Sequence, residues 1–212
     1  QDDAQAVQWY RKAAEQGDDS AQNNLGMMYA NGQGVRQDDA QAVQWFRKAA
    51  EQGNAQAQLN LGVMYYKGRG VRQDDAQAEL WTRKAAEQGG ANAQNNLGAM
   101  YAQGLGVRQD YAQAVQWYRK VAEQGDAEAQ YNLGVMYYNG QGVRQDYTQA
   151  VQWYRKAAEQ GDAEAQYNLG LMYYKGEGVR QDLALAQEWF GKACQNGNQN
   201  GCDNYQRLKA GY

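Results

Sequence analysis

Carboxylates are the side chains of this chain that could most readily perform acid–base chemistry. Its 212 residues include 24 Asp and Glu but no His, so the commonest general base and metal ligand is missing. A catalytic pair, such as that of a glycosidase, is needed once in a molecule, whereas most of these carboxylates recur. Their repetition favours helix capping and a solvated surface, and we expect no enzymatic activity, no cofactor and no metal site. The recurring positions are Asp38, Asp74, Asp110, Asp146 and Asp182, and Glu51, Glu87, Glu123 and Glu159.

Gly-x-Gly pairs are a second group that could do chemistry, because glycine-rich loops can cradle phosphates. A dinucleotide-binding loop needs a preceding strand and a third glycine, and a P-loop needs a following Gly-Lys-Ser/Thr. The chain offers none of these next to its pairs, so we interpret them as helix ends. The pairs are Gly32/Gly34, Gly68/Gly70, Gly104/Gly106, Gly140/Gly142 and Gly176/Gly178.

Two cysteines, Cys194 and Cys202, are separated by seven residues. A helix–turn–helix bend between them can bring their Cβ atoms within bridging range. We expect a disulfide, with two reduced thiols as the alternative; two cysteines without histidine make a poor zinc site. Because disulfides persist in oxidising compartments, the pair predicts a secreted or periplasmic protein.

Six tryptophans lie 36 residues apart, and a Leu-Gly pair recurs with the same period. This period indicates which structural elements position the carboxylates, glycines and cysteines described above. A fixed period of this size indicates one supersecondary unit stacked on copies of itself. We predict an all-α solenoid of 36-residue helix–turn–helix repeats in which each Trp fills the wedge between units. Full burial of one Trp would contribute on the order of 4–6 kcal/mol before entropy is counted. The tryptophans are Trp9, Trp45, Trp81, Trp117, Trp153 and Trp189.

Residues 126–161 illustrate the unit. Asp126 and Asp146 are expected to cap a first and a second helix, Gly140 to end the first, and Trp153 to lie on the buried face of the second. Arg-Lys pairs such as Arg155-Lys156 are expected on the solvated side. The predicted single domain contains residues 1–17 (the second helix of a partial repeat), five full repeats (18–53, 54–89, 90–125, 126–161 and 162–197) and a C-terminal cap helix (198–212).

The repeat resembles a known family. The motif A-x-A-Q-x-N-L-G-x-M-Y-x-x-G-x-G-V, followed by D-x-x-x-A-x-x-W-x-x-K-A-A-x-x-G, is similar to the Sel-one-like repeat, a relative of the tetratricopeptide repeat. The resemblance implies a right-handed superhelix of antiparallel helix pairs, with adaptor or scaffold roles. The C-x7-C spacing is similar to that of exported, cysteine-bearing bacterial members. One departure is Arg where the family often has Pro, at Arg36, Arg72, Arg108, Arg144 and Arg180.

Variation between the repeats indicates where a partner could bind. Scaffold positions repeat, whereas positions at i, i+4 and i+7 of the first helix differ and share one face. In tetratricopeptide-like solenoids this face lines the concave groove, and Tyr is a favoured interface residue. Drift between duplicated units is the alternative. The predicted groove residues are Asn23, Met27, Leu59, Tyr66, Asn95, Tyr131, Val135, Tyr138, Tyr167, Leu171 and Tyr174.

A repeated asparagine follows the first groove position of each unit. Such a side chain could clamp the backbone of a bound peptide, or it could donate a structural hydrogen bond to the neighbouring unit. Both readings stay open from the sequence. The residues included in the predicted groove are Asn60, Asn96, Asn132 and Asn168.

These features predict a non-enzymatic scaffold that binds a peptide or protein in the concave groove. The alternatives are a bacterial envelope protein that binds or acts on cell-wall material, and a purely structural spacer. A net charge of −3 without a basic stripe disfavours nucleic acid, and no apolar run approaches the roughly 20 residues that span a membrane. We expect a monomer, with end-to-end contacts as the alternative. The polar start at Gln1 does not resemble a signal peptide.

Overall fold

The computed structural model describes residues 2–211, which form twelve helices and no strand. The all-α prediction is therefore confirmed. The helices are α1 (Asp3–Glu15), α2 (Asp19–Asn31), α3 (Asp39–Glu51), α4 (Ala55–Lys67), α5 (Asp75–Glu87), α6 (Ala91–Gln103), α7 (Tyr111–Glu123), α8 (Ala127–Asn139), α9 (Tyr147–Glu159), α10 (Ala163–Lys175), α11 (Leu183–Gln195) and α12 (Gln199–Lys209).

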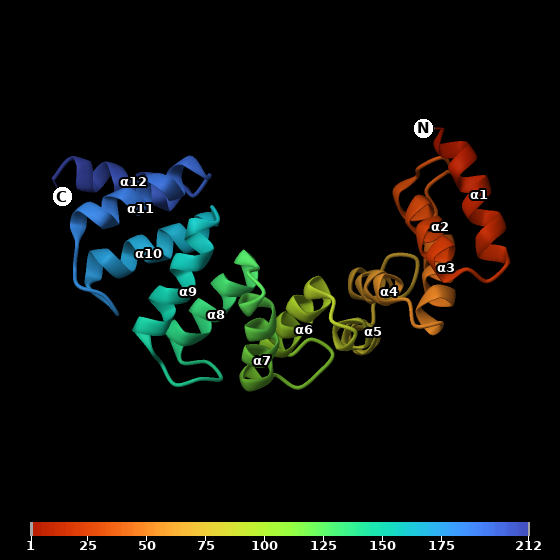
Figure 1. The fold of residues 1–212 in the computed structure, drawn as a ribbon, viewed down its shortest axis with the longest axis horizontal. Coiled ribbons are helices and arrows are strands. Elements are labelled where there is room, and N and C mark those ends of the chain that lie inside the picture. Colours follow the sequence, from red (N-terminus) through yellow and green to blue (C-terminus); the bar gives the residue numbers. More distant parts are fainter. Residues whose placement is uncertain (1, 212) are drawn as a thin grey trace. The chain divides into compact units, whose positions relative to one another are not determined.

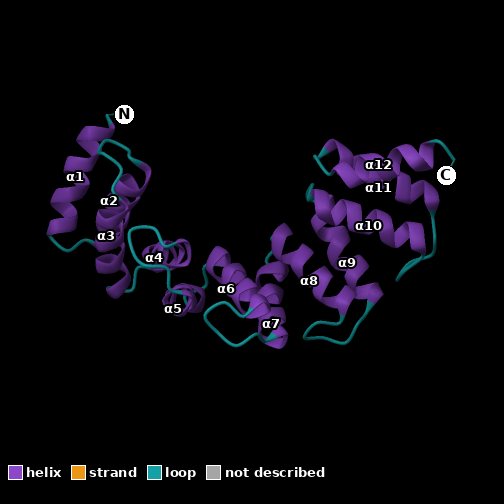
Figure 2. Cartoon of the chain, turned by 180° about the vertical axis from the view of Figure 1, so that it is seen from behind, coloured by secondary structure: helices purple, strands orange, loops and turns teal. Residues whose placement is uncertain are grey.

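The chain divides into two compact units, Gln1–Gln109 and Asp110–Tyr212, which hold α1–α6 and α7–α12. Within each unit, helices that follow one another along the chain pack together as antiparallel neighbours (Figure 1). The loops between them are short, and no strand interrupts the series of helices among the described residues (Figure 2). Each unit is thus built from stacked helical hairpins.

Local capping signals explain where the helices begin and end. The carboxylate of Asp146 accepts a hydrogen bond from the Gln149 N–H at 3.0 Å at the start of α9. Asp182 accepts a hydrogen bond from the Leu185 N–H at the start of α11 in the same way. Gly140 ends α8 in the left-handed conformation, with φ of 67°, which costs glycine little because it has no Cβ.

The second glycine of each Gly-x-Gly pair has a role that the sequence did not predict. Gly142 also has a positive φ, and a Cβ placed on it would collide with the carbonyl of Tyr111 at the start of α7. Gly70 contacts the Asp39 carbonyl at the start of α3 in the same way. These glycines therefore let each loop lie against the backbone of the preceding second helix.

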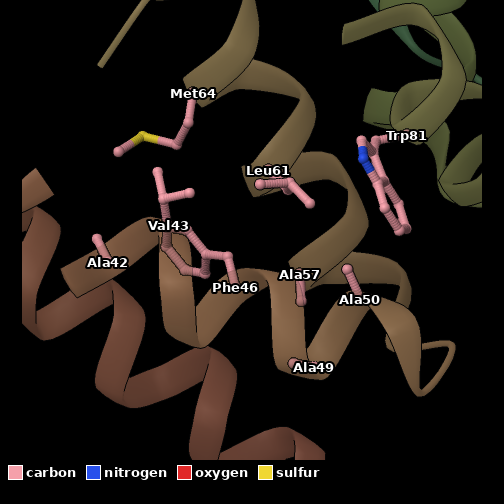
Figure 3. Packing of buried hydrophobic residues seen from close by; sticks show 9 residues of the cluster. All are labelled: Ala42, Val43, Phe46, Ala49, Ala50, Ala57, Leu61, Met64 and Trp81. Atoms are coloured by element: carbon pink, nitrogen blue, oxygen red, sulfur yellow. The ribbon is translucent and has the colours of Figure 1, made fainter. Parts of the chain in front are cut away.

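The core of each hairpin centres on a leucine and on the residue after the tryptophan. Leu25, Leu61, Leu133 and Leu169 are fully buried. Figure 3 shows Val43 and Phe46 of α3 in one cluster with Leu61 and Met64 of α4, where two successive hairpins pack together. The position after the Trp carries a buried ring in four helices, which the sequence analysis did not single out. These residues are Phe46, Tyr118, Tyr154 and Phe190.

The tryptophans are less buried than predicted. Trp81 is 8% exposed and Trp9 is 65% exposed, while the other four are half-buried. Trp45 and Trp81 contact the cores formed by the two helices before them, as a wedge would. However, a lysine three residues on lies over each ring, for example Lys48 at 4.5 Å from the Trp45 centroid. Trp45, Trp81 and Trp189 are amphipathic contacts with neighbouring helices, and the expected burial is wrong for all but Trp81.

The arginine of each Arg-Lys pair is not merely solvated, which corrects the prediction. Arg155 donates to the hydroxyl of Tyr173, 18 residues later, at 2.6 Å. Arg47 donates to Tyr65 at 2.7 Å. Each of these bonds connects a second helix to the first helix of the next hairpin.

Cys194 and Cys202 form the predicted disulfide. Their Cα atoms lie 4.5 Å apart, and the bond joins the end of α11 to α12. It therefore ties down the last helix of the chain.

Candidate functional site

A pocket in the second unit gathers many of the predicted groove residues. Its volume is about 270 Å³, and α8, α9 and α10 form its walls. The first helices α8 and α10 supply most of the lining. The lining includes Tyr131, Val135, Tyr138, Asn168 and Leu171 from the predicted set, with Asn139, Tyr154 and Met172 beside them.

Two further pockets lie in the same register of the repeat. One, between α10, α11 and α12, has a volume of about 520 Å³ and is lined by the predicted residues Leu171 and Tyr174. The other, in the first unit, lies between α4, α5 and α6 and has a volume of about 350 Å³. It includes the predicted residues Tyr66 and Asn96. The first-helix face is therefore hollowed at equivalent places in both units.

The tyrosines of this face differ in how firmly the fold holds them. Tyr131 and Tyr167 are half-buried, and their ring centroids lie 5.9 Å from Tyr154 and 5.7 Å from Phe190. Burial, and then the nearby Glu164 carboxylate, raises the pKa of Tyr131 above its ordinary value. Tyr66 and Tyr174, at 44% and 43% exposed, present far more free surface. They are thus the better probes of binding.

Tyr138 contacts both an aromatic ring and a charged group. Its ring centroid lies 5.2 Å from that of Tyr147. Its hydroxyl donates to the carboxylate of Glu177 at 3.3 Å, and Lys175 lies 3.9 Å from the same carboxylate. This rim of the pocket therefore carries charge of both signs beside an aromatic ring.

The repeated asparagines make bonds within the fold where their partners are known. Asn60 donates to the amide oxygen of Asn23 at 3.0 Å, joining α4 to α2. Asn168 is hydrogen-bonded to Tyr131 of the preceding first helix. Asn60 and Asn168 thus fit the structural alternative, whereas Asn96 is exposed in its pocket and is free to meet a partner.

The remaining predicted groove residues line none of these three pockets. Asn23 and Asn95 are buried, at 6% and 8% exposed, so they offer little contact surface. Met27 is 41% exposed. Leu59, Asn132 and Tyr167 are half-buried.

Metal and membrane chemistry find no support in the described part of the chain. No group of three or more His, Cys, Asp or Glu side chains in residues 2–211 could hold a metal ion. Over the same residues, every helix is too short or too polar to cross a membrane.

Sequence reasoning missed most residues of the first-unit pocket, and Thr82 is the most informative of them. Thr82 stands where α3, α7, α9 and α11 carry a buried ring, and it lines the pocket with Ala78. The signal was present in the sequence, because the residue after each Trp can be compared across repeats. It was overlooked because the position varies between Phe and Tyr and so forms no invariant motif.

Stacked helical hairpins with a hollowed first-helix face define a helical-repeat protein. The chain belongs to the Sel1 repeat family, whose model matches residues 1–18, 19–54, 55–90, 91–126, 127–162 and 163–198. Proteins of this family generally act as scaffolds for protein interactions and are typically non-catalytic.

Solved structures support the assignment of the fold as a Sel1 repeat solenoid. A protective antigen of uropathogenic Escherichia coli is 46% identical with a TM-score of 0.92, over 97% of this chain and 44% of that one. A Sel1 repeat protein from Oxalobacter formigenes is 43% identical with a TM-score of 0.84, over 87% of this chain and 76% of that one. This chain thus spans less than half the length of the E. coli antigen. A search of curated proteins found no match.

Proposed function

We propose that this protein is a non-enzymatic scaffold that binds an extended segment of a partner protein along its first-helix face. The observation that carries the proposal is the recurrence of pockets at the same place in the repeat, in both units. An extended peptide places side chains at regular intervals, so pockets in register suit it better than they suit one compact ligand. Exposed Tyr66 and Tyr174 supply aromatic contact area beside two of the pockets.

Substitution of an exposed groove tyrosine tests this proposal. Peptides selected from a random displayed library would be titrated calorimetrically against the wild type and Tyr174→Ala. Loss of an aromatic anchor should weaken binding by about 1–2 kcal/mol, or roughly tenfold. Because Tyr174 is exposed, the melting temperature should change little.

Leu183→Ala is the matched control. Leu183 is 49% exposed, similar to Tyr174, but it lies in the first turn of the second helix α11 and lines none of the three pockets. The control should bind the peptides as the wild type does. If Tyr174→Ala and Tyr66→Ala both bind with wild-type affinity, the groove proposal is wrong. Peptidoglycan fragments in the same calorimeter test the cell-wall alternative.

We also infer that the protein works outside the cytoplasm. The Cys194–Cys202 disulfide supports this location, because such bonds persist in oxidising compartments. The relative from E. coli is described as a protective antigen, which fits exposure to a host. Mass spectrometry of protein isolated from its native source without reductant, after alkylation, is the test. A pair of alkylated cysteines would remove the support for export.

A further inference from the structure

The hairpin formed by α4 and α5 lacks the ring that fills its counterparts. In α2–α3, a Cβ placed on Gly26 would lie 2.7 Å from the Phe46 ring, so this glycine makes room for the ring. Gly134 and Gly170 face the rings of Tyr154 and Phe190 at the same distance. In α4–α5 the facing residue of Gly62 is Thr82, whose hydroxyl oxygen takes the place closest to the glycine. The threonine side chain is shorter than a Phe or Tyr side chain, so it does not occupy the space that a ring fills in the other hairpins named here.

The space beyond Thr82 is an open pocket. Its volume is about 350 Å³. The equivalent pockets of the second unit have volumes of about 270 Å³ beside the Tyr154 ring and about 520 Å³ beside the Phe190 ring. A cavity of roughly 150 Å³ lined by apolar side chains accepts benzene, so the Thr82 pocket is large enough for one aromatic ring. Its size also lies in the lower part of the roughly 300–1,000 Å³ range of ligand pockets.

The walls of this pocket suit a ring that carries or adjoins a polar group. Val63, Ala99 and Met100 supply apolar surface. Thr82 contributes a hydroxyl and Asn96 an exposed amide. Together they offer hydrogen bonds to one side of an otherwise apolar ligand.

Lys67 gives the mouth of the pocket a positive charge. None of the residues that line the pocket is acidic. The equivalent Lys175 has Glu177 two residues later, at 3.9 Å. Lys67 has Arg69 at that position instead, and Arg69 bonds Asp39 at 2.8 Å. Lys67 itself forms no ion pair among the described residues, so a carboxylate from outside would complement it.

We propose that the Thr82 pocket binds the aromatic side chain of a Phe or Tyr in a partner polypeptide, with a carboxylate of the partner beside that ring pairing with Lys67. The partner would supply the ring that α5 lacks, against the same glycine position that receives a ring from the chain itself in the other hairpins. This inference rests on the proposed function and names the side chain that one part of the groove selects.

A titration with a small probe tests the pocket without knowledge of the partner. 4-Hydroxyphenylacetate carries both a ring and a carboxylate, and 4-methylpentanoate is an aliphatic acid of comparable reach. Two-dimensional NMR of the ¹⁵N-labelled full chain should show amide shifts at Thr82, Asn96 and Lys67 with the aromatic probe at roughly millimolar concentration. The aliphatic acid should bind at least about tenfold more weakly.

Three variants separate the pocket from its surroundings. Thr82→Phe places a ring of the chain itself in the pocket and should abolish the amide shifts caused by the probe. Thr82→Val keeps the pocket volume, and its affinity for the probe should stay within a few-fold of the wild type. Lys67→Gln should weaken 4-hydroxyphenylacetate but not phenol. Absence of shifts in the wild type, undiminished binding by Thr82→Phe, or equal binding of the aliphatic acid would overturn the inference.

The pocket and the groove can fail separately. If the selected peptides bind Thr82→Phe as tightly as the wild type while Tyr174→Ala weakens them, the aromatic pocket is refuted and the scaffold proposal stands. If Tyr174→Ala and Tyr66→Ala are silent while the probe still contacts Thr82, the pocket is retained and the extended groove is refuted.

Discussion

The hairpins α2–α3 and α4–α5 are built on the same repeat but use it differently. In α3, Val43 and Phe46 are buried in an apolar core, and Arg47 bonds Tyr65 of the next first helix. In α5, Glu79 and Thr82 replace those two apolar residues and remain buried. A charge and a hydroxyl thus stand where the other hairpin has hydrocarbon.

The charge in α5 also changes the polar contacts between hairpins. Arg83 binds the Glu79 carboxylate at 2.6 Å, one turn away on its own helix. Its counterpart Arg47 reaches instead to a tyrosine 18 residues later. Trp81 is more buried than the half-buried Trp45. Between these two hairpins, the buried departures from the repeat lie on α5, as expected where stability has been exchanged for a site.

Replacing Phe46 of α3 with the threonine that α5 carries at this position should have the largest effect on stability. Phe46→Thr removes a buried ring and leaves a cavity, so the free energy of unfolding should fall by about 3–5 kcal/mol. Chemical denaturation followed by circular dichroism measures this. A loss below about 1 kcal/mol would mean that the ring position is not the centre of the hairpin core.

Alkaline pH distinguishes hairpins whose ring carries a hydroxyl from those whose ring does not. Burial, and then the Glu128 carboxylate, raises the pKa of Tyr118 to about 12 from an ordinary 10.0. Above pH 10 the unfolded chain loses this proton while the folded chain retains it. The contribution is therefore complete below pH 10 and is lost as pH rises through 12, by roughly 2–3 kcal/mol.

Tyr118→Phe is the variant that isolates this effect. Denaturation of the wild type and the variant at pH 8 and pH 11 should show a smaller alkaline loss in the variant. Equal losses would show that Tyr118 does not titrate differently in the folded and unfolded chains.

The Glu79–Arg83 pair provides a smaller and more specific test. Arg83→Met leaves a buried carboxylate without its cation and should destabilise by about 1–3 kcal/mol, since Arg83 itself is partly exposed. Glu79→Val restores the valine that α3, α7 and α9 carry and should be neutral or stabilising by about 1–2 kcal/mol. In the Glu79→Val background, Arg83→Met should cost less than in the wild type. A cost that is the same in both backgrounds would show that the two side chains are not coupled.

The fold was predictable because its signals are local and repeated. Asp caps, left-handed glycines and the Leu-Gly period act within a few residues, so one repeat reports on all the others. The weight given to the tryptophans was excessive, because invariance alone does not distinguish a core ring from one that lies under a lysine such as Lys48. The role of Gly70 and the partner of Arg47 depend on contacts between hairpins, which no local pattern encodes.

The candidate site was only partly predictable for the same reason. Variation between repeats identified Tyr131 and Tyr138, which line a pocket. It could not show that Tyr131 lies against the buried ring of Tyr154, or that Asn60 is occupied by a bond to Asn23. The division into repeats at 18–53 and onwards stays a prediction; the ranges matched by the family model begin one residue later.

Differential scanning calorimetry of the wild type and Thr82→Phe, each with and without 4-hydroxyphenylacetate, tests the central claim most directly. A ligand that binds only the folded state raises the melting temperature. The melting temperature of the wild type should rise when the probe is added. Without the probe, Thr82→Phe should be more stable than the wild type by about 0.5–2 kcal/mol and should melt at a higher temperature. The probe should not change the melting temperature of Thr82→Phe. A Thr82→Phe protein that is less stable than the wild type, or that still responds to the probe, would contradict an aromatic pocket in α4–α6.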